Sequence, residues 1–315
     1  ARTPATLTWA TGRCTLATNR DLPDPDPRQD RYLVGFNPQR EADDTLLVGR
    51  VTRDRDDAPL ATIVNYACHP TTLAWENTKV SPDYVGAMRE LVESATSHAP
   101  CLFLQGASGE LAPAHQYVGD PAIAEQHGRT LGYAVLSALS SMLPPRQRLV
   151  HERTVESGAP LAVWRPEPFE PATRCEAATV DVELPLKPLP SLAEIDRDLA
   201  ACTDRALAER LRRKRGIVEK VGSGESCALP VWLWRLGDAV LVAQRNEAYS
   251  DFQRALRDAF PERAVCVMNV ANGACGYLYP QGVADRDIYP AWQSPFAPGC
   301  LETLIERTRA AIAAG

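Results

Sequence analysis

Histidine is scarce in this sequence, and long apolar runs are missing. Only five of the 315 residues are histidines, so a site that depends on imidazole groups has few possible positions. No stretch approaches the roughly 20 consecutive apolar residues that a membrane-spanning helix requires. The sequence therefore predicts no transmembrane segment.

An excess of positive charge is also missing. The formal net charge is −6 and the sequence pI is near 5.5, which argues against a nucleic acid partner, because such proteins carry a basic footprint. The one basic run, residues 210–215, lies among acidic residues, and we interpret it as the solvated face of a helix. The balance of 45% hydrophobic and 23% charged residues is that of an ordinary globular protein. We expect one domain over residues 1–315.

Cysteine motifs are absent, although cysteine itself is not. The nine cysteines form an odd, scattered set without a CxxC pair, which indicates neither a disulfide framework nor a zinc ribbon. We expect reduced, mostly buried thiols, which slightly favours a cytoplasmic location. The sequence opens with "ARTPATLTWATGRC", without an initiator Met or a signal-peptide pattern. We therefore expect an upstream segment to be missing or to reside in a separate chain.

The pattern of the remaining residues predicts an α/β fold, with mixed sheets and flanking helices. Three prolines place a loop at 21–30. Strands are expected at 45–52, 60–69, 101–105, 176–184 and 264–272, with a hairpin over 231–244 that turns at Gly237 and Asp238. Helices are expected from Ser81 (N-cap), Pro82 and Asp83 onward, around 131–142, over 191–220 as one helix or a helical hairpin, over 248–259, and at the C-terminus.

His69 closes the apolar stretch 60–69 and is followed at once by Pro70. Its side chain can then project into the cleft that α/β sheets open at the carboxyl ends of their strands. An isolated histidine is more often a structural residue, and Cys68 offers no partner, because adjacent strand residues point to opposite faces.

Glu247 follows an apolar strand and precedes a helix, where a carboxylate is commonly a helix cap. Tyr277 and Tyr289 lie in a Gly- and Pro-rich loop over 273–299. Loops of that length are often functional, and simple aromatic packing explains the two tyrosines equally well.

Four motifs, in order along the chain, resemble those of the neutral ceramidase family. The stretch "VNYACHPTTLAWENTKVSPDYVGAM" is similar to the family pattern INxFAxHxTxM…N…SxDNxGxA. "NRDLPDP" followed by "GFNP" resembles NRSP…NP, and "GYLYPQGVADRDIYPA" resembles GY…YE with the same spacing between its tyrosines. Together with the glutamate before a helix, the motifs align Arg20, His69, Thr72, Asn77, Ser81, Asp83, Gly86, Glu247, Tyr277 and Tyr289.

The resemblance implies a neutral-ceramidase-like catalytic domain, a metal-dependent amidohydrolase that cleaves an amide (N-acyl) bond. It implies that His69, Glu247 and Tyr277 bind Zn²⁺ and that Arg20 and Tyr289 contact the scissile amide. Thr72, Asn77 and Asp83 align with substrate-binding positions. Zinc accepts nitrogen and oxygen ligands and lowers the pKa of a bound water to about 7. The implied substrate is a small-molecule amide or a lipid-like compound.

Three departures from the family pattern qualify the resemblance. The family's first zinc histidine lies on an N-terminal strand that this sequence lacks, and none of His98, His115, His127 and His151 takes its place; His98 and His127 are expected on helix surfaces, His151 at a strand edge and His115 in a loop. The family's GDxSPN is "GELAPA" here, with Ala112 in place of the serine, and a C-terminal immunoglobulin-like domain is missing. We expect a substrate other than ceramide, and a separate N-terminal chain is one source of the absent histidine.

Two other functions stay open at this point. A non-catalytic binding or scaffold subunit could keep the fold without the metal, since one ligand is absent. A serine or cysteine hydrolase that uses Ser108 in "GASGE" is the weaker alternative, because this stretch lacks the GxSxG spacing and a partnered base.

Overall fold

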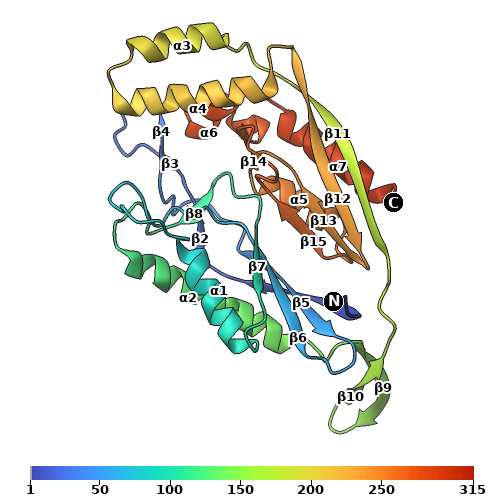
Figure 1. Cartoon of the computed structure of the whole chain (residues 1–315). Helices are drawn as coiled ribbons and strands as arrows, with labels where there is room; N and C mark the ends of the chain where they lie inside the picture. The colour runs from blue at the N-terminus through green and yellow to red at the C-terminus, as the bar shows by residue number, and fades with distance from the viewer. Residues whose placement is uncertain (1) are drawn as a thin grey trace.

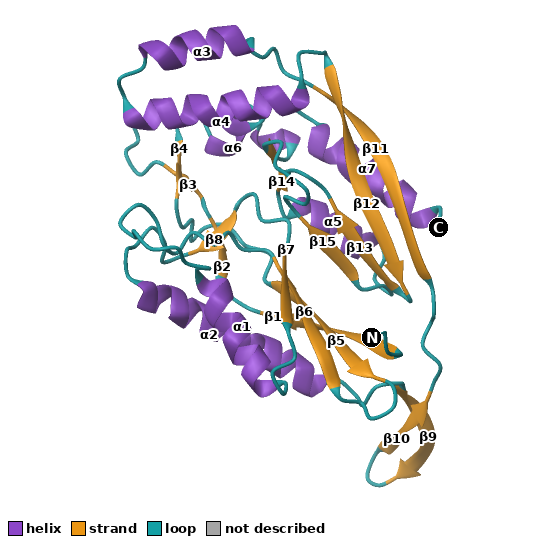
Figure 2. Cartoon of the chain, viewed as in Figure 1, coloured by secondary structure: helices purple, strands orange, loops and turns teal. Residues whose placement is uncertain are grey.

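Two four-stranded sheets pack together in the middle of the molecule, and each is covered on its outer face by a pair of helices. The computed structural model describes residues 2–315 (Figure 1). The sheets meet through a small apolar cluster that includes Leu47, Leu241 and Cys266. The result is a mixed α/β architecture with flanking helices (Figure 2), which confirms the fold class expected from the sequence.

The first sheet has the order β1-β5-β6-β7. Its strands are β1 (Ala5–Arg13), β5 (Thr45–Arg53), β6 (Pro59–Tyr66) and β7 (Cys101–Gln105), antiparallel except for the parallel pair β6 and β7. Helices α1 (Tyr84–Ala95) and α2 (Pro121–Ser141) cover it. Alternate strand residues such as Leu46, Val48 and Val64 pack against Met88 and Leu131 of these helices, as the two-residue period of a strand requires.

The second sheet has the order β11-β12-β13-β15. Its strands are β11 (Cys175–Pro185), β12 (Ser226–Leu236), β13 (Ala239–Ala243) and β15 (Val265–Met268). Helices α5 (Asp251–Ala259) and α7 (Cys300–Ala313) share a core with it. The turn at Gly237 and Asp238 joins β12 and β13, as expected from the sequence.

Short strand pairs lie where the two halves meet. They are β2 (Ala17–Asn19) with β8 (Leu111–Pro113), β3 (Asp21–Pro23) with β4 (Tyr32–Val34), and β14 (Glu247–Ala248) with β16 (Tyr277–Leu278). The chain also forms a projecting hairpin of β9 (Gln147–Glu156) and β10 (Pro160–Pro168), a helical hairpin of α3 (Leu192–Ala201) and α4 (Arg205–Val221), a 3₁₀ turn η1 (Gln281–Val283) and helix α6 (Tyr289–Gln293) (Figure 1).

Several expected boundaries are wrong. Helix α1 begins at Tyr84, with Asp83 as its N-cap at a positive φ of 52°, because the Asp83 carboxylate accepts from the Tyr84 N–H at 2.7 Å and the Leu73 N–H at 2.9 Å. Strand β6 ends at Tyr66, so His69 lies three residues beyond the strand. Helix α5 begins at Asp251 rather than at 248.

Other segments were not expected at all. Part of the stretch 21–30 forms β3, and strand β1 and the hairpin of β9 and β10 were not predicted. His98 lies beyond the end of α1, in a turn with φ 59°. No helix among residues 2–315 combines the length and the apolar character needed to cross a membrane.

Gly128 sets how closely α1 and α2 approach. A Cβ at this position would overlap the Tyr84 carbonyl oxygen and lie 2.7 Å from the Ala87 Cβ. We expect Gly128→Ala to lower the free energy of unfolding by about 1–3 kcal/mol, as overpacking does. The control Gly216→Ala, on α4 where nothing lies within 4 Å, should raise it by about 0.5–1 kcal/mol through helix propensity. Denaturant unfolding of both variants measures this, and an undiminished stability of Gly128→Ala would contradict the close approach.

Candidate functional site

Four of the side chains singled out in the sequence meet at one place. Nε2 of His69 lies 2.9 Å from Oε2 of Glu247, and Nη2 of Arg20 lies 3.3 Å from the same His69 nitrogen. Arg20 Nη2 also donates to the hydroxyl of Tyr277 at 3.0 Å. These residues come from distant parts of the chain, and we call Arg20, His69, Glu247 and Tyr277 the His69 centre.

The short strand pairs bring the centre together. Strands β14 and β16 are parallel, with Glu247 directly opposite Tyr277, and the Glu247 N–H donates to the Gly276 carbonyl at 3.0 Å. Gly276 has φ 84°, and a Cβ there would lie 2.5 Å from the Gln293 carbonyl oxygen. Only glycine fits this position without strain.

The segment 109–111 holds the other two members of the centre. The Gly109 carbonyl accepts from Arg20 Nε at 3.2 Å and Nη2 at 2.8 Å. The Leu111 carbonyl accepts the His69 backbone N–H at 2.9 Å and lies 3.1 Å from His69 Nδ1. The carbonyls of Gly109 and Leu111, two residues apart in the chain, therefore fix the guanidinium and the imidazole relative to each other.

The protonation state of the centre follows from burial and from its charges. Burial lowers the pKa of His69, and the charge of Arg20 lowers it further against the opposing effect of Glu247. Burial opposes the ionisation of Glu247, yet its bonds to His69 and Tyr277 and the charge of Arg20 lower its pKa overall. Burial raises the pKa of Tyr277. At neutral pH the centre holds a neutral imidazole, a carboxylate and a phenol.

A neutral His69 has one hydrogen for two acceptors. The Leu111 carbonyl faces Nδ1, and the Glu247 carboxylate faces Nε2 at 2.9 Å. Arg20 can only donate and the carboxylate can only accept, so the two groups that face Nε2 favour opposite tautomers of the ring. With the proton on Nε2, the imidazole donates to Glu247; with the proton on Nδ1, a cation shared by Nε2 and the carboxylate oxygen would take the place of that hydrogen.

The donor set of the centre fits zinc. Imidazole nitrogen, carboxylate oxygen and phenol oxygen are ligand types of the kind that zinc accepts, and three protein ligands leave a position for water. Within residues 2–315, His, Cys, Asp and Glu side chains do not gather into a metal-binding group of three. In this centre the third oxygen or nitrogen atom available to a metal is the Tyr277 hydroxyl, which accepts a hydrogen bond from Arg20.

Tyr289 borders the centre without a direct bond to it. Its ring lies 5.8 Å from the Tyr277 ring in an edge-on arrangement, and its hydroxyl accepts from Arg213 Nη1 at 3.1 Å. It is the first residue of α6, so the phenol is held on a helix rather than on a free loop.

Tyr117 is a neighbour of the centre that the sequence did not reveal. Burial raises its pKa, and the nearby Arg20 opposes that effect. Its backbone has φ 63°, and its ring stacks on the exposed Trp75 with centroids 6.3 Å apart. Left-handed backbone in a bulky residue is strained and gathers at functional sites, but nothing in the local sequence signals it.

The three residues aligned with substrate-binding positions do not join the His69 centre. Thr72 is buried, with its hydroxyl 3.0 Å from Nδ1 of His127. Asn77 bonds within its own turn, to the backbone of Lys79. Asp83 caps α1. His127, expected on a helix surface, is half-buried against Thr72, and burial lowers its pKa.

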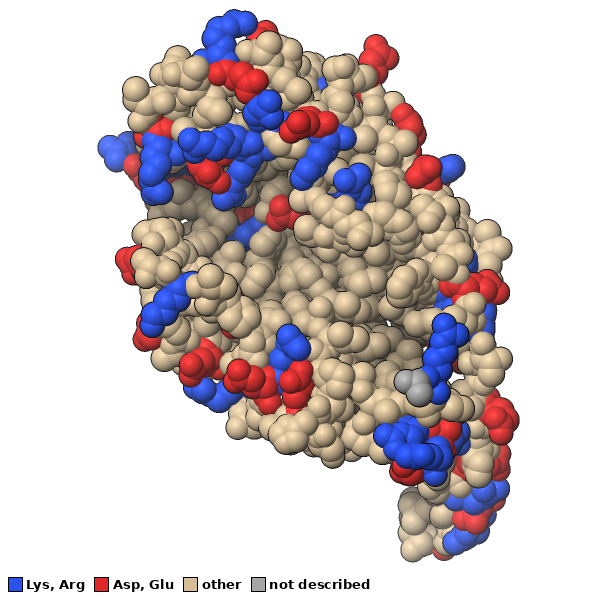
Figure 3. All heavy atoms as spheres, in the orientation of Figure 1, with Lys and Arg blue, Asp and Glu red and all other residues tan. Residues whose placement is uncertain are grey.

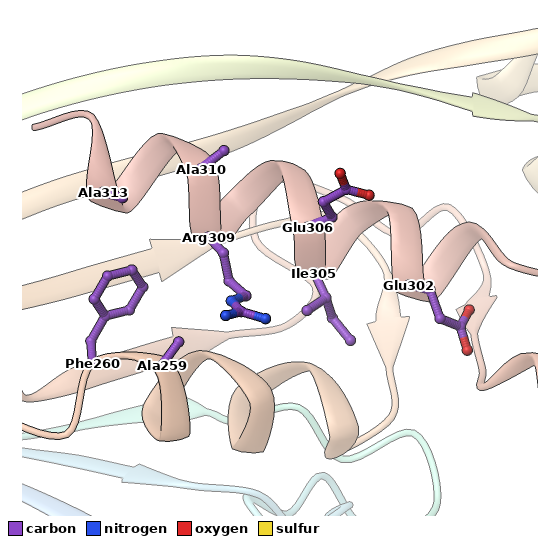
Figure 4. Close-up of a pocket in the computed structure, with 8 residues that line it drawn as sticks. All are labelled: Ala259, Phe260, Glu302, Ile305, Glu306, Arg309, Ala310 and Ala313. Atoms are coloured by element: carbon purple, nitrogen blue, oxygen red, sulfur yellow. The ribbon is translucent and has the colours of Figure 1, made fainter.

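Two surface hollows lie apart from the centre. One lies between α5 and α7, lined by Phe260, Ile305 and Arg309 among others (Figure 4). The other lies beside the α3–α4 hairpin, between 186–194 and 218–225. No member of the His69 centre lines either of them.

The fold belongs to a known type. The chain has a ceramidase-like fold, and it corresponds to a part of the ceramidase structures. It superimposes on neutral ceramidase from Pseudomonas aeruginosa with a TM-score of 0.62 at 15% sequence identity, over 99% of this chain and 52% of that one. A ceramidase complexed with C2 matches with a TM-score of 0.61 at 13% identity, over 99% of this chain and 54% of that one. The chain thus spans about half the length of these structures, and no family model or curated protein matches its sequence.

Glu110 lies behind the centre, and its carboxylate anchors the segment 109–111. It accepts from the backbone N–H of Ser250 at 3.0 Å and from the Ser250 hydroxyl. Burial raises the pKa of Glu110 to about 8, although the bonds from Ser250 oppose this.

This shift predicts a stability that falls with rising pH. The folded state holds the proton more tightly than the unfolded chain, so the contribution is complete below pH 4.5, the ordinary value, and is lost as the pH rises through about 8. The loss amounts to at most about 5 kcal/mol, since one pKa unit corresponds to about 1.4 kcal/mol. Glu110→Gln should remove this part of the pH dependence. Urea unfolding at pH 5, 6.5 and 8 measures it, with the exposed Glu262→Gln as the control; equal slopes for Glu110→Gln and the wild type would contradict it.

Proposed function

We propose that this chain is a zinc-dependent hydrolase that cleaves an amide (N-acyl) bond with a metal-activated water. The observation that supports this most strongly is the contact of 2.9 Å between a neutral imidazole nitrogen and a carboxylate oxygen, beside the Tyr277 phenol. His69, Glu247 and Tyr277 would hold the ion. When bound, zinc lowers the pKa of a water ligand to about 7 and polarises a carbonyl group.

Arg20 would stabilise the negative charge that develops on the amide oxygen. Burial opposes its charge, yet Tyr277 and Glu247 raise its pKa, so the guanidinium stays protonated. Its bonds to the Gly109 carbonyl fix its orientation before a substrate arrives. A donor that is already in place avoids reorganisation during the reaction, which is the main source of oxyanion stabilisation in enzymes.

Tyr289 would supply a second polar group at the substrate. Its ring packs edge-on against Tyr277, which brings its hydroxyl to the border of the centre on the side of α4. A neutral phenol can donate to a carbonyl oxygen or to the leaving nitrogen.

The substrate would be a small-molecule amide or a lipid-like compound other than ceramide. Neutral ceramidases share the fold at only 13–15% identity, and Ala112, which replaces the family's serine, is fully buried in β8. A site that differs in its polar groups selects a different amide.

A non-catalytic binding subunit is the second candidate. The absence, within residues 2–315, of a third His, Cys, Asp or Glu near His69 and Glu247 favours it. We propose instead that a separate N-terminal chain supplies a further histidine, in the place of the first zinc histidine of the family that the sequence resembles. The intact mass of the purified complex, with or without a second polypeptide, separates the two.

Zinc binding tests the proposed function directly. We expect about one zinc per chain, and His69→Ala or Glu247→Gln should weaken binding by at least about 100-fold, beyond the 10–100-fold typical of residues that only support ligands. Because burial lowers the pKa of His69, affinity should hold until the pH falls below its ordinary value of 6.5. Isothermal titration calorimetry with zinc measures both effects.

The exposed His151→Gln, on the projecting hairpin, is the matched control and should bind zinc like the wild type. Less than a tenth of an equivalent in the wild type, purified without chelator, would contradict the proposal. An equal affinity of Glu247→Gln and the wild type would also contradict it.

A further inference from the structure

Helix α4 is strongly basic in an acidic protein. It carries seven Lys or Arg residues and two Glu residues, whereas the whole chain has a net charge of −6. Figure 3 shows Lys and Arg side chains gathered along this helix, above a hollow in the same face of the molecule. The interpretation of residues 210–215 as a purely solvated face is therefore incomplete.

Two of these arginines turn toward the residues around the His69 centre. Arg213 donates to the Tyr289 hydroxyl at 3.1 Å, and the guanidinium carbon of Arg210 lies 5.1 Å from the centre of the Trp292 ring. The two arginines are three residues apart on α4, and the two aromatic residues are three apart on α6. Each pair therefore lies on one face of its helix, and these two faces contact each other.

Only one side chain separates Arg213 from the centre. The Tyr289 ring that accepts from Arg213 packs 5.8 Å from the Tyr277 ring, and Tyr277 is bonded to Arg20. An acidic group held by Arg213 would therefore lie one tyrosine side chain away from an amide placed at Tyr277 and Arg20.

The charge of this arginine pair is only partly balanced. Glu209 accepts from Arg213 Nε at 3.0 Å, and the Arg213 Nη1 group donates to Tyr289. Arg210 makes no ion pair with any of residues 2–315 and lies over the Trp292 ring. By contrast, Arg215 on another face of α4 is paired with Asp196 and Glu219. Guanidinium groups bind carboxylate and phosphate oxygens in a bidentate manner, so an unbalanced pair at a site mouth favours an anionic ligand.

We propose that Arg210 and Arg213 bind an anionic oxygen group of the substrate, so that the substrate is an N-acyl compound with a carboxylate or phosphate on the side of the scissile amide that faces Tyr289. The inference rests on the proposed function for the position of the amide. It goes beyond that function in selecting charged amides over neutral ones. A membrane surface is the other ligand that a basic helix can bind, but Tyr289 and Trp292 hold these two arginines against α6.

Binding of three matched compounds tests this inference. N-octanoylglycine and N-octanoylphosphoethanolamine carry an acid, and N-octanoylglycinamide is neutral. Calorimetry on the zinc-loaded protein should give at least about 10-fold tighter binding of one of the acids, as expected for charge-assisted hydrogen bonds. Arg210→Gln and Arg213→Gln should each bring the ratio of acid to neutral affinity toward one. The control Arg215→Gln should keep the ratio of the wild type.

Hydrolysis of the same compounds separates the two proposals. An acid preference in binding without hydrolysis of any compound would overturn the proposed function and support the anion site. Hydrolysis of all three with equal kcat/KM and equal affinity would overturn the anion site alone. Equal affinities, together with binding to phosphatidylglycerol vesicles that Arg210→Gln abolishes, would assign the arginines to a membrane surface and also overturn it.

Discussion

The contact between His69 and Glu247 is the constraint on which the functional account depends. A neutral imidazole carries one hydrogen, and here two acceptors compete for it, the Leu111 carbonyl at 3.1 Å and the Glu247 carboxylate at 2.9 Å. Burial and the neighbouring Arg20 both disfavour a second proton on the ring. A cation placed between the imidazole nitrogen and the carboxylate oxygen would leave the single hydrogen to the Leu111 carbonyl. The backbone carbonyls of Leu111 and Gly276 hold the two residues in place.

Much of the fold follows from the sequence, because the larger elements have strong local patterns. The strands Thr45–Arg53 and Cys101–Gln105 and the α3–α4 hairpin lie where apolar content and helical composition predicted them. The misplaced start of α1 has a tertiary cause, since Asp83 serves the Leu73 N–H as well as the helix. The two-residue strands β14 and β16 are too short for any periodic signal, although they place Glu247 opposite Tyr277.

The candidate site was predictable only where motifs carried it. Arg20, His69, Glu247 and Tyr277 were singled out in the sequence and lie together, but the carbonyls of Gly109 and Leu111 that orient them belong to residues without polar side chains. Tyr117 and Arg213 were missed for a different reason, because their roles depend on which face of a loop or helix turns inward. Composition shows that α4 is basic, and only packing shows that Arg210 and Arg213 face α6.

The most direct test of this account is the protonation of the His69 ring, observed by ¹⁵N NMR at neutral pH before and after addition of zinc. We predict a singly protonated ring in both states, and we expect zinc to shift the Nε2 resonance and to leave the single hydrogen on Nδ1. A doubly protonated ring at pH 7, or an Nε2 resonance that zinc leaves unchanged, would contradict it.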